Sequence, residues 1–383
     1  MFHCYVFYPF ILRVLSSGKK DNEITFVPNG EQLPNVFVVF SVFNEEKVIR
    51  EKLESIFNAT YPLHKLKVYL GSDNSTDNTN NIISEYVLKY PQLIFVPYAE
   101  RNGKPKVLDK LVNRINESNQ IRSKDVFVFT DANVIFTTST ITELVKHFKN
   151  ESIGLVAANI ISKAVQQDGI SLQEKTYTRG ETAIKHWEGL IWGTMIGAFG
   201  GCYAMRADCW VDIPDNYIVD DFYLSMNVLA QGKKAISEMN AKCIEDVSND
   251  VEQEFNRKAR IQTGNLQNLS TYWKLLFRFN AVSFCFFSHK IIRWMGPLFI
   301  ALAYATNAWL LSMGPFYYFT FLLQNILLVS PVIDAIFKRA GIHWMPLRFI
   351  SYFYMMNLAL LNGFIIYLTG VKSSTWTPTK RNV

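Results

Sequence analysis

The 383-residue sequence lacks the cysteine and histidine patterns that mark disulfide-stabilised or zinc-binding proteins. Its five cysteines include no CxxC pair and its six histidines include no HxxxH pattern, so we expect free thiols in a reducing compartment and no zinc site. A basic stripe with interleaved aromatic residues is also missing, although the net charge is +6. We therefore expect no nucleic-acid partner, and the positive charge suits a phosphate-bearing substrate or an anionic membrane surface.

The N-terminus lacks the basic region and the small-residue cleavage site of a signal peptide. Residues 2–15 are apolar but short for a complete membrane span. We interpret residues 1–17 as an N-terminal membrane helix that is either tilted or missing its upstream end.

Apolar residues are abundant near the C-terminus, where charges become scarce. Residues 291–370 hold three apolar stretches, each long enough to span a bilayer, at 291–313, 315–337 and 347–368. Basic residues precede the first stretch and follow the second, so the positive-inside rule places the soluble part in the cytoplasm of a multi-pass protein of the inner or plasma membrane. Three spans would put the tail, residues 371–383, outside, although it is basic; the sequence leaves this conflict open.

Residues 267–290 precede these stretches and contain apolar side chains at three-and-four spacing. This spacing predicts an amphipathic helix in the membrane interface. A helix packed on the soluble domain is the alternative.

Residues 18–266 have the pattern of a soluble α/β domain. Apolar runs predict buried strands at 35–42, 66–71, 93–96 and 125–130, and helical spacing predicts helices at 46–57, 77–90 and 106–115. The alternation predicts a largely parallel, doubly wound sheet, in which ligands bind at the carboxyl ends of the strands.

Polar residues follow each predicted strand. Asn44 follows the first, and Asp73 lies in the SDNSTDNT loop (72–79) after the second. Lys104 follows Gly103 after the third strand and could meet a phosphate, while Asp131, with Asn133 two residues later, could bind Mg²⁺ or Mn²⁺. Each signal alone also fits a helix cap, a turn or a solvated loop.

Further candidates lie downstream. Gly200 and Gly201 form a flexible loop, and Asp220-Asp221 precede a helical run at 222–229. These carboxylates could favour the helix dipole or supply a general base. Arginines at 257 and 260 share a helix face and could clamp phosphates.

In their order along the chain, these motifs resemble those of the family 2 glycosyltransferases, and among them the membrane synthases of poly-N-acetylglucosamine, hyaluronan, cellulose and chitin. The resemblance covers about residues 36–264 and extends to WTPTKR at 376–381. It implies a GT-A fold with C-terminal transmembrane helices, and an inverting enzyme that moves a sugar from a nucleotide donor, expected to be UDP-linked, to a growing polysaccharide or lipid-linked glycan.

The resemblance also implies a role for each matching residue. Asp221 would be the catalytic base, supported by Asp220, while Gly201 and Ile261 would contact the acceptor. Asp131 and Asn133 would bear Mg²⁺ or Mn²⁺. Donor binding would fall to Asn44, Glu46, Asp73, Lys104, Asp131, Arg257 and Arg260.

Three departures from the family pattern matter. Asn133 replaces the second Asp of the usual DxD, Asp220 replaces a Glu, and Ile261 replaces the Trp of QxxRW, with Arg257 in the Gln position. The loss of the Trp puts processive elongation in doubt. A catalytically weak or inactive nucleotide-sugar-binding membrane protein, acting as a sensor or assembly partner, is the alternative function.

Overall fold

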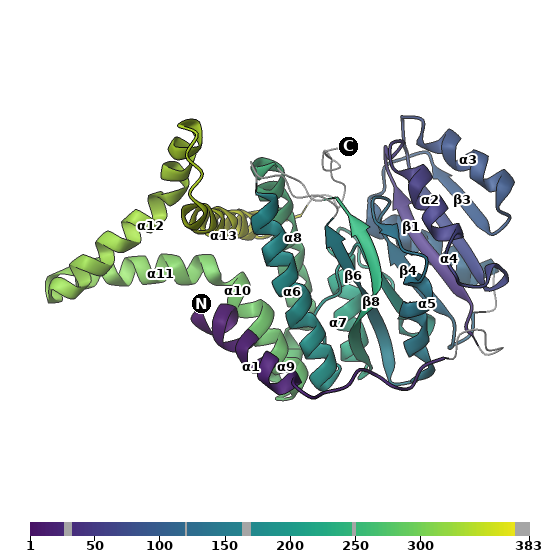
Figure 1. Ribbon diagram of the computed structural model, residues 1–383, viewed down its shortest axis with the longest axis horizontal. Helices are drawn as coiled ribbons and strands as arrows, with labels where there is room; N and C mark the ends of the chain where they lie inside the picture. Colours follow the sequence, from purple (N-terminus) through teal and green to yellow (C-terminus); the bar gives the residue numbers. More distant parts are fainter. Residues whose placement is uncertain (27–32, 119–120, 163–169, 247–249, 372–383) are drawn as a thin grey trace.

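The computed structural model describes residues 1–26, 33–118, 121–162, 170–246 and 250–371. Figure 1 shows a sheet domain at one end and an arm of long helices at the other, with helices α6 (Ser171–Trp192) and α8 (Val251–Tyr272) between them. The predicted tail, apart from its first residue, and the WTPTKR element lie outside the described residues.

Eight strands of the described chain form one sheet in the order β3-β2-β1-β4-β7-β6-β8-β5. The strands are β1 (Val36–Val42), β2 (Leu66–Asp73), β3 (Leu93–Tyr98), β4 (Val126–Thr130), β5 (Ile135–Phe136), β6 (Ile153–Ser162), β7 (Cys202–Arg206) and β8 (Lys234–Glu245). The four predicted strands are present and pair in parallel. The sheet as a whole is mixed, because β7 runs antiparallel to both β4 and β6.

The reversal at β7 brings two distant strand ends together. Thr130 at the end of β4 pairs with Cys202 at the start of β7. The backbone N–H of Asp131 and the hydroxyl of Thr130 both donate to the carbonyl of Gly201, at 3.1 and 2.9 Å. The glycine loop therefore lies directly beside Asp131.

Helices cover both faces of the sheet. They are α2 (Ile49–Phe57), α3 (Thr79–Lys89), α4 (Lys104–Ser118), α5 (Thr140–Val145) and α7 (Asp220–Ala230), besides α6 and α8. Alternate residues of β1 enter two different cores: Val38 packs with α2, α3 and α5, and Val39 packs with α4 and α7. Burial on both faces is the reason that β1 is a continuous apolar run.

The segment predicted as one interface helix is broken. The helix α8 continues to Tyr272, a 3₁₀ turn spans Trp273–Phe277, and Phe279 has a left-handed φ of 48° before Asn280 caps α9 (Ala281–Cys285). Tyr272 is buried in the core of the sheet domain, whereas Phe279 is 90% exposed. The predicted boundary at residue 267 thus falls inside α8, and the apolar spacing does not belong to one helical face.

The described residues contain three helices that are long and apolar enough to cross a membrane. These are α11 with its 3₁₀ extension (Gly296–Met313), α12 (Pro315–Arg339) and α13 (Met345–Thr369); the short α10 (Ile292–Trp294) precedes them. The first begins five residues later than predicted. Figure 1 shows α11 and α12 extending away from the domain, while α13 returns to pack on α8.

The N-terminal helix also packs on the domain. A π-helical turn (His3–Phe7) leads into α1 (Tyr8–Ser16), whose Tyr8 and Leu12 are fully buried against Ile184 of α6. The Tyr8 hydroxyl donates to Glu188 at 2.7 Å. Because one face of α1 is anchored to α6, the other face alone is exposed.

Candidate active site

A cavity of about 970 Å³ lies at the carboxyl ends of the parallel strands and extends down to α13. Its lining includes Asp73 from β2, Asp131 after β4 and Asp221 from α7. The strand-end argument predicts that Asp73 and Asp131 lie at one edge of the sheet, and the resemblance implies that Asp221 joins them. The structure places all three in this cavity.

Lys104 holds the centre of an acidic cluster in this cavity. Its Nζ lies 2.6 Å from Asp131 Oδ1 and 3.9 Å from Asp220 Oδ2. Burial alone would lower the pKa of Lys104, but the carboxylates of Asp131 and Asp220 outweigh burial and hold this pKa above its usual value. Lys104 is therefore a fixed positive charge.

Asp220 and Asp221 begin α7, where the helix dipole favours negative charge. Asp220 is 4% exposed, and burial raises its pKa to about 6 against the opposing effect of Lys104. Burial likewise raises the pKa of Asp221, whose Oδ1 accepts the N–H of Phe222. Burial thus favours the protonated form of both carboxyl groups, and Asp220, with a pKa of about 6, changes protonation just below neutral pH.

Gly200 makes room for Asp221. A Cβ atom at position 200 would lie 2.9 Å from Asp221 Oδ2. Any larger residue there would push the carboxylate out of its present position. The second glycine, Gly201, lines the cavity as expected, beside the neighbouring Ile160.

The carboxylate of Asp73 accepts hydrogen bonds from other groups of the protein. It accepts hydrogen bonds from the backbone N–H of Asn102 and Gly103, at 2.6 and 3.0 Å, and from Arg101 Nε at 3.2 Å. Gly103 has φ of 84°, a conformation that glycine adopts readily, and Lys104 follows it. Asp73 therefore fixes the loop that directs Lys104 into the cavity. A contact between Asp73 and a nucleotide-sugar donor would be an additional role.

Asn44 and Glu46 do not line the cavity, contrary to the expected contact with a donor. The side chain of Asn44 accepts the N–H of Thr76, and that of Glu46 accepts the N–H of Asn78. Both side chains thus tie the loop after β1 to the loop after β2. Their neighbour Glu45 lines the cavity instead.

Asn133 lines the cavity near Glu245, which ends β8, and its Nδ2 donates to Glu245 Oε1 at 3.3 Å. No group of three His, Cys, Asp or Glu side chains within the described ranges is placed to hold a metal ion. Oxygen atoms of Asp131, Asn133 and Glu245 could supply part of a hard-ion site, which a ligand's phosphate oxygens would complete.

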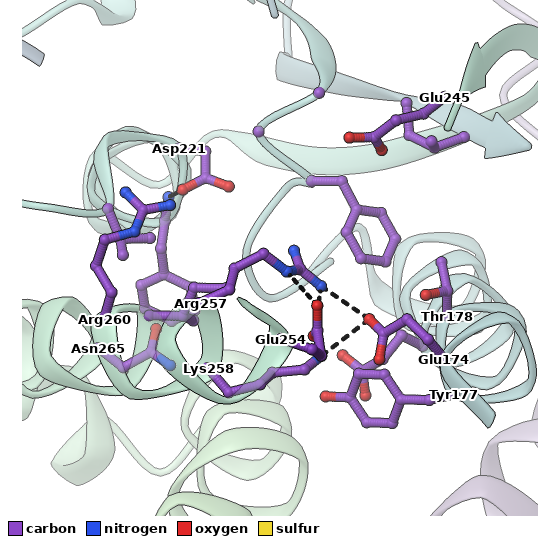
Figure 2. A pocket seen from close by; sticks show the side chains of 18 of the residues that line it. Glu174, Tyr177, Thr178, Asp221, Glu245, Glu254, Arg257, Lys258, Arg260 and Asn265 are labelled. Atoms are coloured by element: carbon purple, nitrogen blue, oxygen red, sulfur yellow. Dashed lines mark hydrogen bonds and ion pairs between the residues drawn. The ribbon is translucent and has the colours of Figure 1, made fainter. Parts of the chain in front are cut away.

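The two arginines of α8 point in different directions. Figure 2 shows Arg260 beside Asp221, whereas Arg257 turns toward α6. Arg257 lies 2.8 Å from both Glu174 and Glu254, so its charge is already paired. Burial and the adjacent Arg257 lower the pKa of Arg260. Only Arg260 is therefore aimed at the acidic cluster, although both residues line the cavity.

Glu245 and Lys185 are charged lining residues that the sequence did not predict. Glu245 comes from a strand that the sequence analysis did not identify. Lys185 lies in the middle of α6, with its Nζ 3.5 Å from the centre of the Phe199 ring, and burial lowers its pKa to about 7. A lone lysine within a helix carries no motif, so only the structure could reveal it. The acceptor residue expected at 261, an isoleucine, does line the cavity.

Comparison with known sequences identifies the domain. Residues 37–205 match the profile of the family described as glycosyl transferase family 2. The probable glycosyltransferase YdaM of Bacillus subtilis is 40% identical over 84 residues, 21% of this chain and 20% of that protein. Beta-monoglucosyldiacylglycerol synthase of Nostoc sp. is 25% identical over 153 residues, 39% of this chain and 30% of that protein. The matches thus span less than a third of these relatives.

Comparison with solved structures extends over nearly the whole chain. The mannosyltransferase PcManGT of Pyrobaculum calidifontis, in complex with GDP-Man and Mn²⁺, superposes with a TM-score of 0.70 at 19% identity. The superposition covers 96% of this chain and 95% of that one. This similarity confirms the GT-A fold that the sequence resemblance predicted, and the synthase subgroup stays a prediction.

Proposed function

Because residues 37–205 match the profile of glycosyl transferase family 2, we propose that this chain is an inverting glycosyltransferase that uses a nucleotide-sugar donor. The observation that carries the proposal is the convergence of Lys104, Asp131, Asp220 and Asp221 in one cavity at the strand ends. A general base and a cation next to each other are what transfer from a sugar diphosphate requires.

Asp221 acts as the base. Its carboxylate removes the proton of an acceptor hydroxyl while that oxygen forms a bond to the anomeric carbon and the bond from this carbon to the diphosphate breaks. Attack on the face opposite the leaving group inverts the configuration. The nucleoside diphosphate leaves with the bonding electrons, and Asp221 keeps the proton until solvent removes it.

Lys104 and Arg260 stabilise the negative charge that grows on the leaving group. Both cations face the acidic cluster, and both are largely buried, so their fields are weakly screened. Preorganised charges of this kind lower the barrier without rearranging during the reaction. Asp220 adds a second negative charge near Lys104, with its Oδ2 3.9 Å from Lys104 Nζ.

We propose that the donor is bound with Mg²⁺ or Mn²⁺ held by Asp131, with Asn133 and Glu245 close enough to contribute. The Asp131 side chain is 34% exposed at the cavity, which leaves it accessible to an ion. When bound, the ion would neutralise the charge of the diphosphate. Removal of divalent ions by EDTA is expected to weaken donor binding.

We further propose that the protein works at a membrane, with the catalytic domain on the cytoplasmic side. Three helices of sufficient length and apolar character support this placement. The basic residues Lys338 and Arg339 at the end of α12 support the orientation.

The test incubates membranes carrying the full chain with labelled UDP- and GDP-sugars, with and without Mn²⁺. We expect one donor to label a product, and we expect Asp221→Asn to reduce the rate by about 10²–10⁴-fold, the usual contribution of a general base. Asp215→Asn, the same change at an exposed position on the loop before α7, is the control and should retain full activity. Unchanged incorporation by Asp221→Asn would refute the assigned base. Donor binding without transfer from any donor would favour the non-catalytic alternative.

A further inference from the structure

The cavity continues well beyond the acidic cluster and changes character along its length. At the far end its wall is built from α13 and the N-terminal helices, and the side chains there are mostly apolar: Tyr5, Pro9, Phe349, Phe353, Met356 and Leu360. The cavity therefore has a charged end at the sheet and an apolar end among helices of the membrane arm.

The apolar end lies against a helix with the length and composition of a membrane span. The helix α13 contacts α8 closely, because Gly363 lets its backbone approach the carbonyl of Ala259, where a Cβ would lie only 2.4 Å away. Thr263 Oγ1 on α8 donates a hydrogen bond to the Gly363 carbonyl on α13 at 3.0 Å, which stabilises the contact between the two helices. The described part of α13 thus forms a tight wall beside the cavity.

A belt of paired charges separates the two ends. Figure 2 shows Arg257 and Lys258 bonded to Glu174 and Glu254, and the hydroxyl of Tyr352 on α13 donates to Glu174. A second group of paired charges consists of Glu181 with Lys290 and Arg293. A belt of paired charges next to an apolar wall has the order of a membrane interface, where headgroups meet acyl chains.

This order suits an amphiphile better than a polysaccharide. Sugar hydroxyls buried against Phe353, Met356 and Leu360 would lose hydrogen bonds to water without finding new partners, which costs free energy for each group. Hydrocarbon chains have no polar groups to desolvate, so they lose no hydrogen bonds at the same surface.

We propose that the acceptor is a membrane lipid with a free hydroxyl group at its polar end. Its hydroxyl would reach Asp221, the rest of the polar end would lie at the charged belt, and its hydrocarbon chains would lie along α13 and the N-terminal helices. This inference rests on the proposed transferase function and names the acceptor class for the same cavity. It implies that one sugar, or very few, is added to each lipid.

The test uses the full chain reconstituted in phosphatidylcholine vesicles, with the donor that is consumed in the assay above. Diacylglycerol, glucosyldiacylglycerol and a soluble oligosaccharide are offered separately, and the labelled product is partitioned between organic and aqueous phases and weighed by mass spectrometry. We expect the label in the organic phase, on a lipid that carries one added sugar.

A matched pair of variants locates the lipid. Leu360→Trp fills the apolar end, whereas Leu358→Trp makes the same change at a side chain that is 51% exposed and does not line the cavity. We expect Leu360→Trp to raise the KM for the lipid at least tenfold and Leu358→Trp to leave it unchanged. Donor binding and the slow hydrolysis of donor by water report folding and should be unchanged in both variants.

The outcomes distinguish failure of the lipid acceptor from failure of the proposed transferase function. Donor consumption that labels only the oligosaccharide or water, or equal lipid KM values for the two variants, overturns the lipid acceptor and leaves the transferase standing. If no donor is consumed at all, the transferase proposal fails and the lipid acceptor fails with it.

Discussion

At the scale of single residues, Lys104 sets the charge state of the site. Burial pushes the pKa values of Asp220 and Asp221 upward, and Lys104 is the main group that opposes this effect. With Lys104 in place the pKa of Asp220 is about 6, so Asp220 is largely ionised at neutral pH. A base that must accept a proton depends on this balance.

Lys104→Met should therefore move the acidic limb of the pH–rate profile to higher pH. The activity needs ionised carboxylates, so kcat/KM falls as the pH drops through their pKa; without the cation this pKa rises by about one unit or more. The measurement is kcat/KM from pH 5 to 9 with the best donor. Lys106→Met, an exposed lysine two residues further along α4, serves as the control and should keep the original limb. A limb that stays in place or moves to lower pH would contradict the assigned role.

The candidate site shows what sequence can and cannot predict for side chains. The position after a buried parallel strand correctly predicted Lys104 and Asp131 as neighbours, because all such strand ends lie at one edge. The same rule failed for Asn44: its φ of 53° turns the chain, and its side chain bonds to the next loop instead of facing the cavity. Glu245 and Lys185 reach the site from elements far along the chain, and no local pattern reveals such tertiary contacts.

At the scale of elements, α8 supports the start of α7. Gly264 lets α8 approach Val219, the residue before Asp220; a Cβ on Gly264 would lie 2.4 Å from Val219 Cγ2 and 3.1 Å from Val219 N. Asn268 donates to the Val219 carbonyl at 3.1 Å, four residues further along the same helix face. The position of both carboxylates therefore depends on this close helix contact.

Gly264→Ala should lower kcat strongly while it changes the free energy of unfolding only slightly. Alanine gains about 1 kcal/mol of helix propensity, which offsets part of the 1–3 kcal/mol cost of overpacking. The shift forced on Val219 displaces the adjacent carboxylates, and a misplacement near 1 Å costs about 10²-fold in rate. Thermal unfolding and kcat should be measured together. The stability control is Gly180→Ala in α6, where a Cβ meets nothing within 4 Å and should stabilise by about 0.5–1 kcal/mol.

A second variant tests the cause of the Gly264→Ala effect. Val219→Ala combined with Gly264→Ala removes the nearest clashing methyl group and should restore part of the lost rate. If Gly264→Ala retains full activity, or if the double variant is slower than the single one, close approach of α8 does not position the carboxylates.

The sequence also predicted which segments form strands better than it predicted the direction in which each strand runs. The parallel strands β1 to β4 were expected because apolar runs alternate with helical spacing. The reversal at β7 was not, since the period of a strand is the same in both directions. The interface helix predicted at 267–290 does not form, because α8 ends at Tyr272 and a 3₁₀ turn and the left-handed Phe279 follow. Tyr272 is buried in the domain core, so the apolar spacing there reflects packing on the domain.

At the scale of the whole molecule, two exposed apolar surfaces differ in extent. On the sheet domain a residue such as Leu88, which is 90% exposed, stands on the otherwise ordinary surface of α3. On α12 most apolar side chains are exposed, and only 6% of the most apolar window is buried. Monomeric soluble proteins rarely expose apolar surface continuously over a helix of 25 residues, so the surface of α12 supports the proposed membrane placement.

Leu328→Arg, near the middle of α12, should therefore weaken membrane integration. An arginine at the centre of a spanning helix costs about 2.5–3.5 kcal/mol on the insertion scale, and the lost leucine adds a few tenths. The fraction of protein that resists alkaline carbonate extraction from membranes should fall, or the chain should be degraded. Leu88→Arg places the same charge on the exposed face of α3 and should leave both extraction and yield unchanged. Equal extraction of the two variants would mean that α12 does not cross the bilayer. Contact between α13 and lipid would then not depend on α12.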